Sequence, residues 1–258
     1  MDYTFFALLL ASALFVGMLV FLELGHRLGD RFEAIDPEGA HSGTGPVDGA
    51  VFALLGLLVA FTFSGAAARF DGRRHLIVEE ANAIGTAYLR LDVAPPDAQP
   101  ALRELFRRYL DSRLVVYRKL PNLEEARAEL AHSATIQQEI WSRAVAACDA
   151  AGPRPCGILL LPALNALIDI TTTRTMAALM HPPAIVFGLL FVLGLGCAVL
   201  AGYSMAGGER RKWAHMIAFA AIMAVTVYVI LDLEYPRLGL IRVDASDQVL
   251  VELRETMR

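Results

Sequence analysis

Four long apolar runs constrain this chain more than any other feature of its sequence. The first covers residues 3–22 and, after its first position, contains only Thr4 and Ser12 as weakly polar residues. About twenty residues, each rising about 1.5 Å in a helix, match a hydrocarbon core of roughly 30 Å. Residues 49–68, 184–203 and 213–231 have the same character. The sequence therefore predicts four membrane-spanning helices.

The composition agrees with a protein whose main partner is the lipid bilayer. Of the 258 residues, 56% are hydrophobic and 19% are charged, which is more apolar than an ordinary soluble domain. The net charge of -4 is spread along the chain without a basic run, so no nucleic-acid partner is expected. The chain starts with Met1 and Asp2 and has no basic segment before its long first apolar run, so we expect an anchor rather than a cleaved signal peptide.

The polar segments divide the chain into four parts. Residues 1–64 hold spans one and two with a polar connecting loop at 23–48, and residues 65–183 form an insert. Spans three and four occupy 184–231, and a polar tail covers 232–258. Prolines and the loop "GPRPCG" split the insert into about four helices, the first of which continues directly from span two. The predicted fold class is an all-α membrane protein, with four transmembrane helices and a helical insert between spans two and three.

The loop charges favour one orientation in the membrane. The short loop after span three holds Arg210, Arg211 and Lys212, and the loop after span one holds Arg27 and Arg31. Because basic residues of short loops stay inside, this pattern places the insert and both termini outside. Basic residues beyond spans two and four argue the other way; they are Arg69, Arg73, Arg74, Arg237 and Arg242.

Two of the three cysteines are close in sequence within the insert. Cys148 and Cys156 flank the segment "DAAGPRP", a spacing at which a disulfide can join two helix ends. An oxidising periplasm would permit this bond. The alternative is a pair of small buried thiols, and Cys197, inside span three, is expected only to pack.

Sequence signatures of enzymes are missing. The six histidines are isolated, and the chain contains no HExxH, no phosphate-binding glycine loop and no G-x-S-x-G motif. The dispersed cysteines and histidines lack the spacing of metal ligands. We therefore predict no enzymatic activity, no cofactor and no metal site.

The segment "LLVAFTFSGAAARFD" (57–71) resembles the second membrane helix of bestrophins. More broadly, the chain resembles the bacterial bestrophin-like domain family of unknown function. Members of that family have two spans, a helical insert, two more spans and a tail similar to "LDLEYPRLGLIRVD". The resemblance implies a homo-oligomer, a pentamer, that conducts small inorganic ions, with span two lining the pore. It implies anions as the ions, and an insert in the cytoplasm, opposite to the loop charges.

The resemblance also implies where the pore is narrowest. In bestrophins, bulky apolar residues at every fourth position form the neck, and the corresponding residues here are Ala53, Leu57 and Phe61. Residues four apart share a helix face, and apolar rings can gate a pore by dewetting. Ala53 is small and Ala60 replaces the family's glycine, which leaves two bulky rings. The alternative is that these side chains face lipid or neighbouring helices.

Charged residues follow at the polar end of the same helix. Rings of Arg69, Arg73 and Arg74 would attract anions into a vestibule. The alternative is that they snorkel to the interface and pair with Glu79 or Glu80.

Polar side chains on two insert helices form a further candidate network, either a conduction vestibule or a satisfied structural cluster. Its members are Glu79, Glu80, Asn82, Asn165, Asp169 and Arg174.

The resemblance to bestrophins, together with these patterns, implies an oligomeric ion channel of a bacterial inner membrane that conducts anions through a pore lined by the second span. The alternative function is a non-conducting membrane sensor or scaffold whose helical insert binds a partner.

Overall fold

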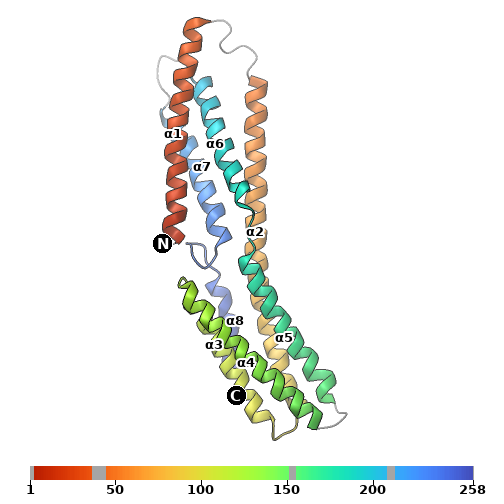
Figure 1. Cartoon of the computed structure of the whole chain (residues 1–258). Coiled ribbons are helices and arrows are strands. Elements are labelled where there is room, and N and C mark those ends of the chain that lie inside the picture. The colour runs from red at the N-terminus through yellow and green to blue at the C-terminus, as the bar shows by residue number, and fades with distance from the viewer. Residues whose placement is uncertain (1–2, 37–44, 151–154, 208–212, 258) are drawn as a thin grey trace. The chain divides into compact units, whose positions relative to one another are not determined.

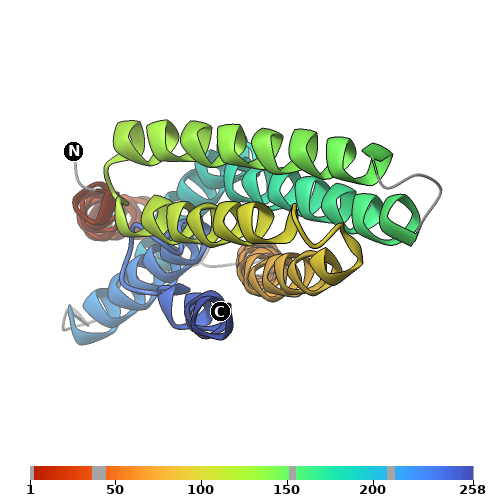
Figure 2. The same ribbon diagram turned by 90° about the horizontal axis from the view of Figure 1, so that it is seen from below.

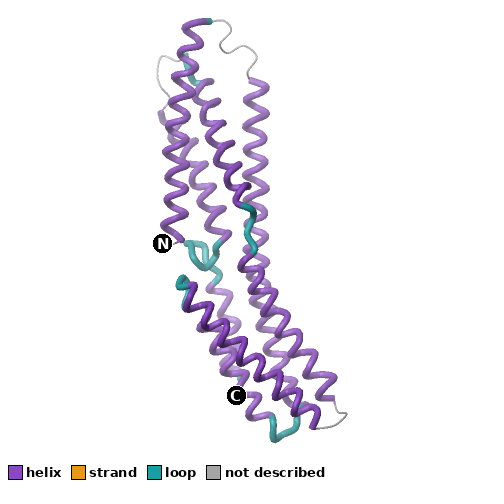
Figure 3. Tube along the Cα trace, viewed as in Figure 1, coloured by secondary structure: helices purple, strands orange, loops and turns teal. Residues whose placement is uncertain are grey.

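The computed structural model describes residues 3–36, 45–150, 155–207 and 213–257, and these are helical almost throughout (Figures 1 and 3). Four helical segments are long and apolar enough to cross a membrane, which confirms the predicted fold class. The elements are α1 (Tyr3–Ile35), α2 (Gly45–Leu89), η1 (Arg90–Val93), α3 (Gln99–Arg118), α4 (Leu123–Ala150), α5 (Pro155–Leu179), α6 (Ala184–Ser204), α7 (Trp213–Glu234), η2 (Asp244–Asp247) and α8 (Gln248–Thr256).

The chain divides into two compact units. The membrane unit comprises Met1–Ala68 and His181–Tyr235, and the insert unit comprises Arg69–Met180 and Pro236–Arg258. Helix α2 is unbroken and contributes residues to both, because it contains no proline after its first turn and its internal glycines are isolated.

Glycines bring α1 and α6 into close contact in the membrane unit. A Cβ atom on Gly25 would lie 2.1 Å from the carbonyl oxygen of Val199, and one on Gly202 would lie 2.0 Å from the carbonyl oxygen of Leu22. Because any side chain would collide with backbone here, only glycine permits this separation of the helices. Small residues are the usual means of close helix packing in membranes.

The predicted start of the loop between spans one and two is wrong. The polar character of residues 23–35 suggested a loop, but α1 continues to Ile35. Gly25 and Gly29 keep this extension against α6, and the Nε atom of Arg27 donates to Glu23 over 2.7 Å one turn away. Contacts with α6 thus extend the helix beyond its apolar part.

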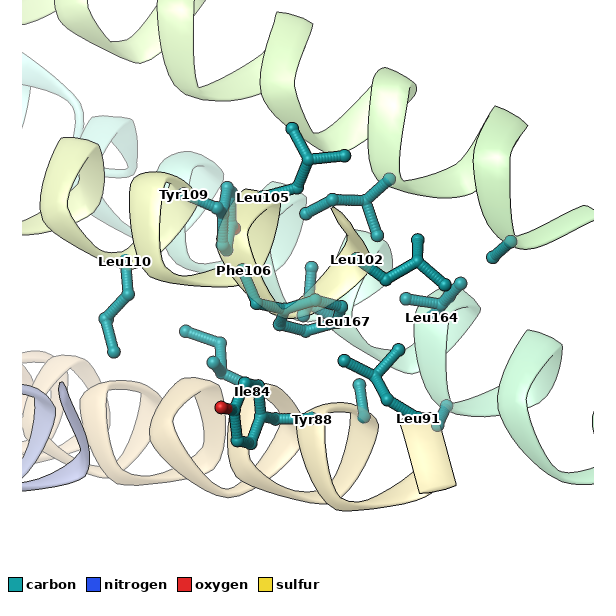
Figure 4. Close-up of a cluster of buried hydrophobic side chains, with 14 of the residues drawn as sticks. Ile84, Tyr88, Leu91, Leu102, Leu105, Phe106, Tyr109, Leu110, Leu164 and Leu167 are labelled. Atoms are coloured by element: carbon teal, nitrogen blue, oxygen red, sulfur yellow. The ribbon is translucent and has the colours of Figure 1, made fainter. Parts of the chain in front are cut away.

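The insert unit has its own apolar core. Helix α4 lies alongside α3 and α5 (Figure 2). In Figure 4, side chains from α3, such as Phe106 and Leu102, point toward Ile84 and Tyr88 of α2 and toward Leu167 of α5. These side chains occur at helical spacing, so each helix presents one apolar face to the others.

The C-terminal segment is part of the insert unit rather than a separate tail. Its helix α8 buries Leu250 in the core of the insert unit. At the surface, Arg254 donates two hydrogen bonds, of 2.8 and 3.0 Å, to the carboxylate of Asp111 on α3. The segment after α7 is therefore tied to the insert by an apolar anchor and an ion pair.

Candidate functional site

One face of α2 is exposed along most of the helix. At about 100° per residue, ten residues of α2 between Ala53 and Thr86 fall within an arc of about 80°, and all ten are exposed. We call this set the α2 stripe; it consists of Ala53, Leu57, Phe61, Ser64, Ala68, Asp71, His75, Glu79, Asn82 and Thr86.

Within the membrane unit, the α2 stripe is apolar and then small. Phe61 is 67% exposed and Leu57 is 52% exposed, whereas Leu55 and Ala66 on the other side of α2 are buried. Of the residues in the apolar window of α2, 11% are buried, compared with 44% for α7. This part of α2 thus has much more uncovered surface than α7.

Within the insert unit, the α2 stripe is polar. Asp71, His75, Glu79, Asn82 and Thr86 are exposed, while Ile77, Ile84 and other apolar residues of α2 enter the core. Three of the five exposed side chains are titratable, and none of the three is arginine or lysine.

The three arginines predicted for a vestibule lie outside the arc of the stripe. Arg73 is only 9% exposed, and its guanidinium donates to the carbonyl oxygens of Ala177 (3.1 Å) and Met180 (2.9 Å) at the end of α5. Carbonyls at a helix C-terminus attract such a cation. Arg74 is exposed and lies 3.4 Å from Asp71, and Arg69 is half-buried.

A buried ion cluster joins three helices of the insert unit. Glu80 is fully buried and accepts a hydrogen bond of 2.6 Å from the Nε of Arg113 on α3. Its other oxygen pairs with Arg174 on α5. Burial alone would raise the pKa of Glu80, but the two guanidinium groups outweigh burial and hold that pKa below its usual range. Glu80 is therefore an ionised structural partner.

Three guanidinium groups surround the ring of Tyr117 in the same cluster. The central carbons of Arg174, Arg237 and Arg113 lie 4.1, 4.2 and 5.4 Å from the ring centre. Such placements are favourable cation–π contacts. Arg237 also donates two hydrogen bonds, of 2.7 and 2.9 Å, to Asp247, which joins the C-terminal segment to the cluster.

The predicted polar network is divided between the interior and the surface. Glu80 and Arg174 meet in the buried cluster, but Glu79 and Asn82 belong to the exposed α2 stripe. Asn165 and Asp169 are exposed on α5. The predicted network did not include four members of the buried cluster: Arg113, Tyr117, Arg237 and Asp247. Of these, only Tyr117 had a signal in the sequence, because it falls on the apolar stripe of α3.

A second group of polar side chains was also missed, at the end of α7 in the membrane unit. Glu234 and Asp232 are fully buried. The Nδ1 atom of His181 lies 3.6 Å from Glu234, and its ring stacks on Tyr235 with the ring centres 4.2 Å apart. The hydroxyl of Tyr3 donates to the carbonyl of Leu231 over 2.8 Å, which connects this group to the start of α1.

Cys148 and Cys156 form a disulfide between α4 and α5, with their Cα atoms 5.3 Å apart. Both residues are buried in the insert core. Cys197 is a buried free thiol in α6. Among the described residues, no group of three or more His, Cys, Asp or Glu side chains is close enough to hold a metal ion.

Comparison with known proteins agrees with this architecture. Two crystal structures of variants of a bacterial bestrophin homologue from Klebsiella pneumoniae match with TM-scores of 0.64 and 0.61. Each is 14% identical and covers 93–94% of this chain and 97–98% of its own. A crystal structure of a protein described only as a membrane protein matches with a TM-score of 0.60 and 15% identity, over 94% of this chain and 99% of its own.

No curated protein matches the sequence. The sequence model of the bestrophin-like domain, in contrast, matches residues 16–248, which is most of the chain. The chain therefore belongs to the bestrophin-like domain family.

Proposed function

We propose that this chain is the subunit of a homo-oligomeric ion channel in a bacterial inner membrane, with α2 lining the pore. The observation that carries the proposal is the α2 stripe. Its membrane portion holds the exposed residues Ala53, Leu57 and Phe61, which are the positions implied by the bestrophin resemblance. The resemblance also supports a pentamer.

The alternative is that lipid covers this face, as it covers many apolar membrane surfaces. The same face of α2 continues into the insert unit as polar residues, as a pore would need. The same arc of α2 that presents Leu57 and Phe61 presents Asp71, His75 and Glu79 further along. A water-filled path along this arc would be apolar at Leu57 and Phe61 and polar where it widens beyond the membrane. Rings of Leu57 and Phe61 would then form an apolar constriction that gates by dewetting.

The disulfide supports a location of the insert unit on the oxidising side of the membrane. Disulfides persist in the periplasm and are rare in the cytosol. Arg27, near the far end of α1, is consistent with that orientation. The basic residues 210–212, which belong to the same charge argument, lie outside the described part of the chain. The proposed orientation is opposite to the one implied by the bestrophin resemblance.

Single-channel recording of the purified protein in planar bilayers tests the proposal. We expect Phe61→Ala to raise the conductance or the open probability several-fold, because it removes the larger apolar ring. Phe63→Ala is the matched control: Phe63 is also exposed on α2 but lies about 200° further around the helix from Phe61. We expect this control to behave as the wild type.

Two results would contradict the proposal. One is a particle image of the purified protein that shows a monomer, a dimer, or a ring with α2 at its lipid-facing edge. The other is a protein that stays silent across lipids, salts and pH values. Either would favour the alternative of a non-conducting sensor or scaffold.

A further inference from the structure

The charged groups of the α2 stripe allow an inference about which ions pass. It rests on the proposed function, since the stripe must face the pore for its charges to act on ions. Resemblance to bestrophins implies anions, and the sequence predicted an anion vestibule from Arg69, Arg73 and Arg74. The positions of these arginines do not favour that vestibule.

Arg73 is the clearest case. It lies about 160° around α2 from the centre of the stripe, and its guanidinium is bonded to the backbone at the end of α5. Arg69 lies about 120° from that centre and Arg74 about 100°. A ring formed around the stripe would therefore turn Arg69 and Arg73 away from its axis, whereas the guanidinium of Arg74 lies 3.4 Å from Asp71 at the edge of the stripe.

The carboxylates of α2 are arranged in the opposite way. Asp71 and Glu79 fall inside the arc of the stripe and are exposed. Glu80, the neighbour of Glu79, faces the interior, where Arg113 and Arg174 neutralise it. The fold thus pairs one glutamate with buried arginines and leaves the adjacent one on the stripe. Asp71 has the exposed Arg74 at 3.4 Å, so the stripe together with this arginine keeps a net negative formal charge.

We propose that Asp71 and Glu79 form two rings of carboxylates in the vestibule of the oligomer and that the channel prefers small cations over anions. Carboxylate rings are the usual selectivity element of cation channels. His75 lies between them on the same stripe, and Asn82 and Thr86 add uncharged oxygen ligands beyond Glu79. Each copy of the chain would contribute one residue to each ring.

The size of the effect follows from elementary electrostatics. Several carboxylates about 10 Å from a common axis, in water and at physiological ionic strength, change the ratio of cation to anion occupancy by about threefold or more. Removal of one ring should therefore shift the permeability ratio without abolishing conduction. Removal of both rings should shift it further.

The test measures the permeability ratio of K⁺ to Cl⁻ from reversal potentials in a KCl gradient across planar bilayers. The reversal potential of the wild type should be shifted toward the equilibrium potential of K⁺. Glu79→Gln should reduce the ratio by about threefold, and Asp71→Asn combined with Glu79→Gln should reduce it further. Both variants should keep the wild-type oligomer size and thermal midpoint, because neither carboxylate is buried.

Glu124→Gln is the matched control, because Glu124 is an exposed carboxylate in the first turn of α4, away from the α2 stripe. We expect no change in its permeability ratio. An anion-selective wild type, or an equal shift in Glu124→Gln and Glu79→Gln, would overturn the inference while leaving the channel proposal intact. A wild type that does not conduct would instead remove the channel proposal, and this inference with it.

Discussion

Substitution of Glu80 by glutamine should strongly destabilise the insert unit. The change removes one charge and almost no volume from a fully buried site. Glu80 is the acceptor for both Arg113 and Arg174, whose side chains are 1% and 7% exposed. Loss of one partner of a buried ion pair typically costs about 3–5 kcal/mol, because the remaining charge stays buried without compensation. Two guanidinium groups lose their shared carboxylate here, but Arg174 keeps Asp247 as a partner at 3.2 Å, so we expect the middle of this range.

Thermal unfolding of the purified full-length protein in detergent measures this effect. For a unit of this size, about 3 °C of the midpoint temperature corresponds to 1 kcal/mol, so Glu80→Gln should lower the midpoint by about 10–15 °C. Glu79→Gln is the matched control, since it makes the same chemical change at the next position. Glu79 is exposed, and we expect its midpoint to stay within about 2 °C of the wild type.

The pH dependence provides a second test of the same reasoning. Because the pKa of Glu80 is lowered in the folded state, its stabilising contribution is fully present above the unfolded pKa of about 4.3. That contribution is lost as the pH falls through the folded pKa. The difference in midpoint between the wild type and Glu80→Gln should therefore be constant above about pH 5 and shrink only in stronger acid.

Equal midpoints for Glu80→Gln and Glu79→Gln at pH 7 would contradict this role of Glu80. A difference between the wild type and Glu80→Gln that grew as the pH was lowered would contradict it as well. Either outcome would mean that Glu80 is not held ionised by the two arginines.

Two further predictions concern the membrane unit and the disulfide. Gly202→Ala should prevent the close packing of α1 on α6. The variant should aggregate in size-exclusion chromatography or unfold at a much lower temperature. Gly196→Ala, on the same helix with open space at its Cβ position, should behave as the wild type. The disulfide can be detected in cells that are quenched with acid and whose free thiols are blocked with N-ethylmaleimide. When the disulfides are then reduced and labelled with a maleimide polymer, Cys148 and Cys156 should each take up one polymer. Deletion of the host's periplasmic thiol oxidase should remove that label; two free thiols in unperturbed cells would contradict the proposed orientation.

The predictability of each feature depended on the range of the interactions that produce it. The four spans and the helical insert follow from local hydrophobicity and periodicity, which a single sequence displays directly. The continuity of α2 was predictable for the same reason, because nothing within it breaks a helix. The end of α1 was not, because contacts of Gly25 and Gly29 with a helix far away in sequence extend it past the apolar run.

The candidate site shows the same division. The positions of Ala53, Leu57 and Phe61 on one face follow from helical spacing alone. The sequence of α2 also contains Glu79 and Glu80 side by side, and nothing local distinguishes them. Only the tertiary structure decides that Glu80 is buried, because its partners come from helices 33 and 94 residues further along the chain.

Sequence by itself thus determined the class of protein, its membrane spans and the apolar face that we propose for the pore. Tertiary structure decided which charges remain on that face. Whether a charged side chain is buried or exposed depends on its partners, and partners on helices distant in sequence do not appear in any local pattern. For that reason the arginine vestibule was a natural prediction, and the exposed stripe with Asp71 and Glu79 became visible only once the helices were packed.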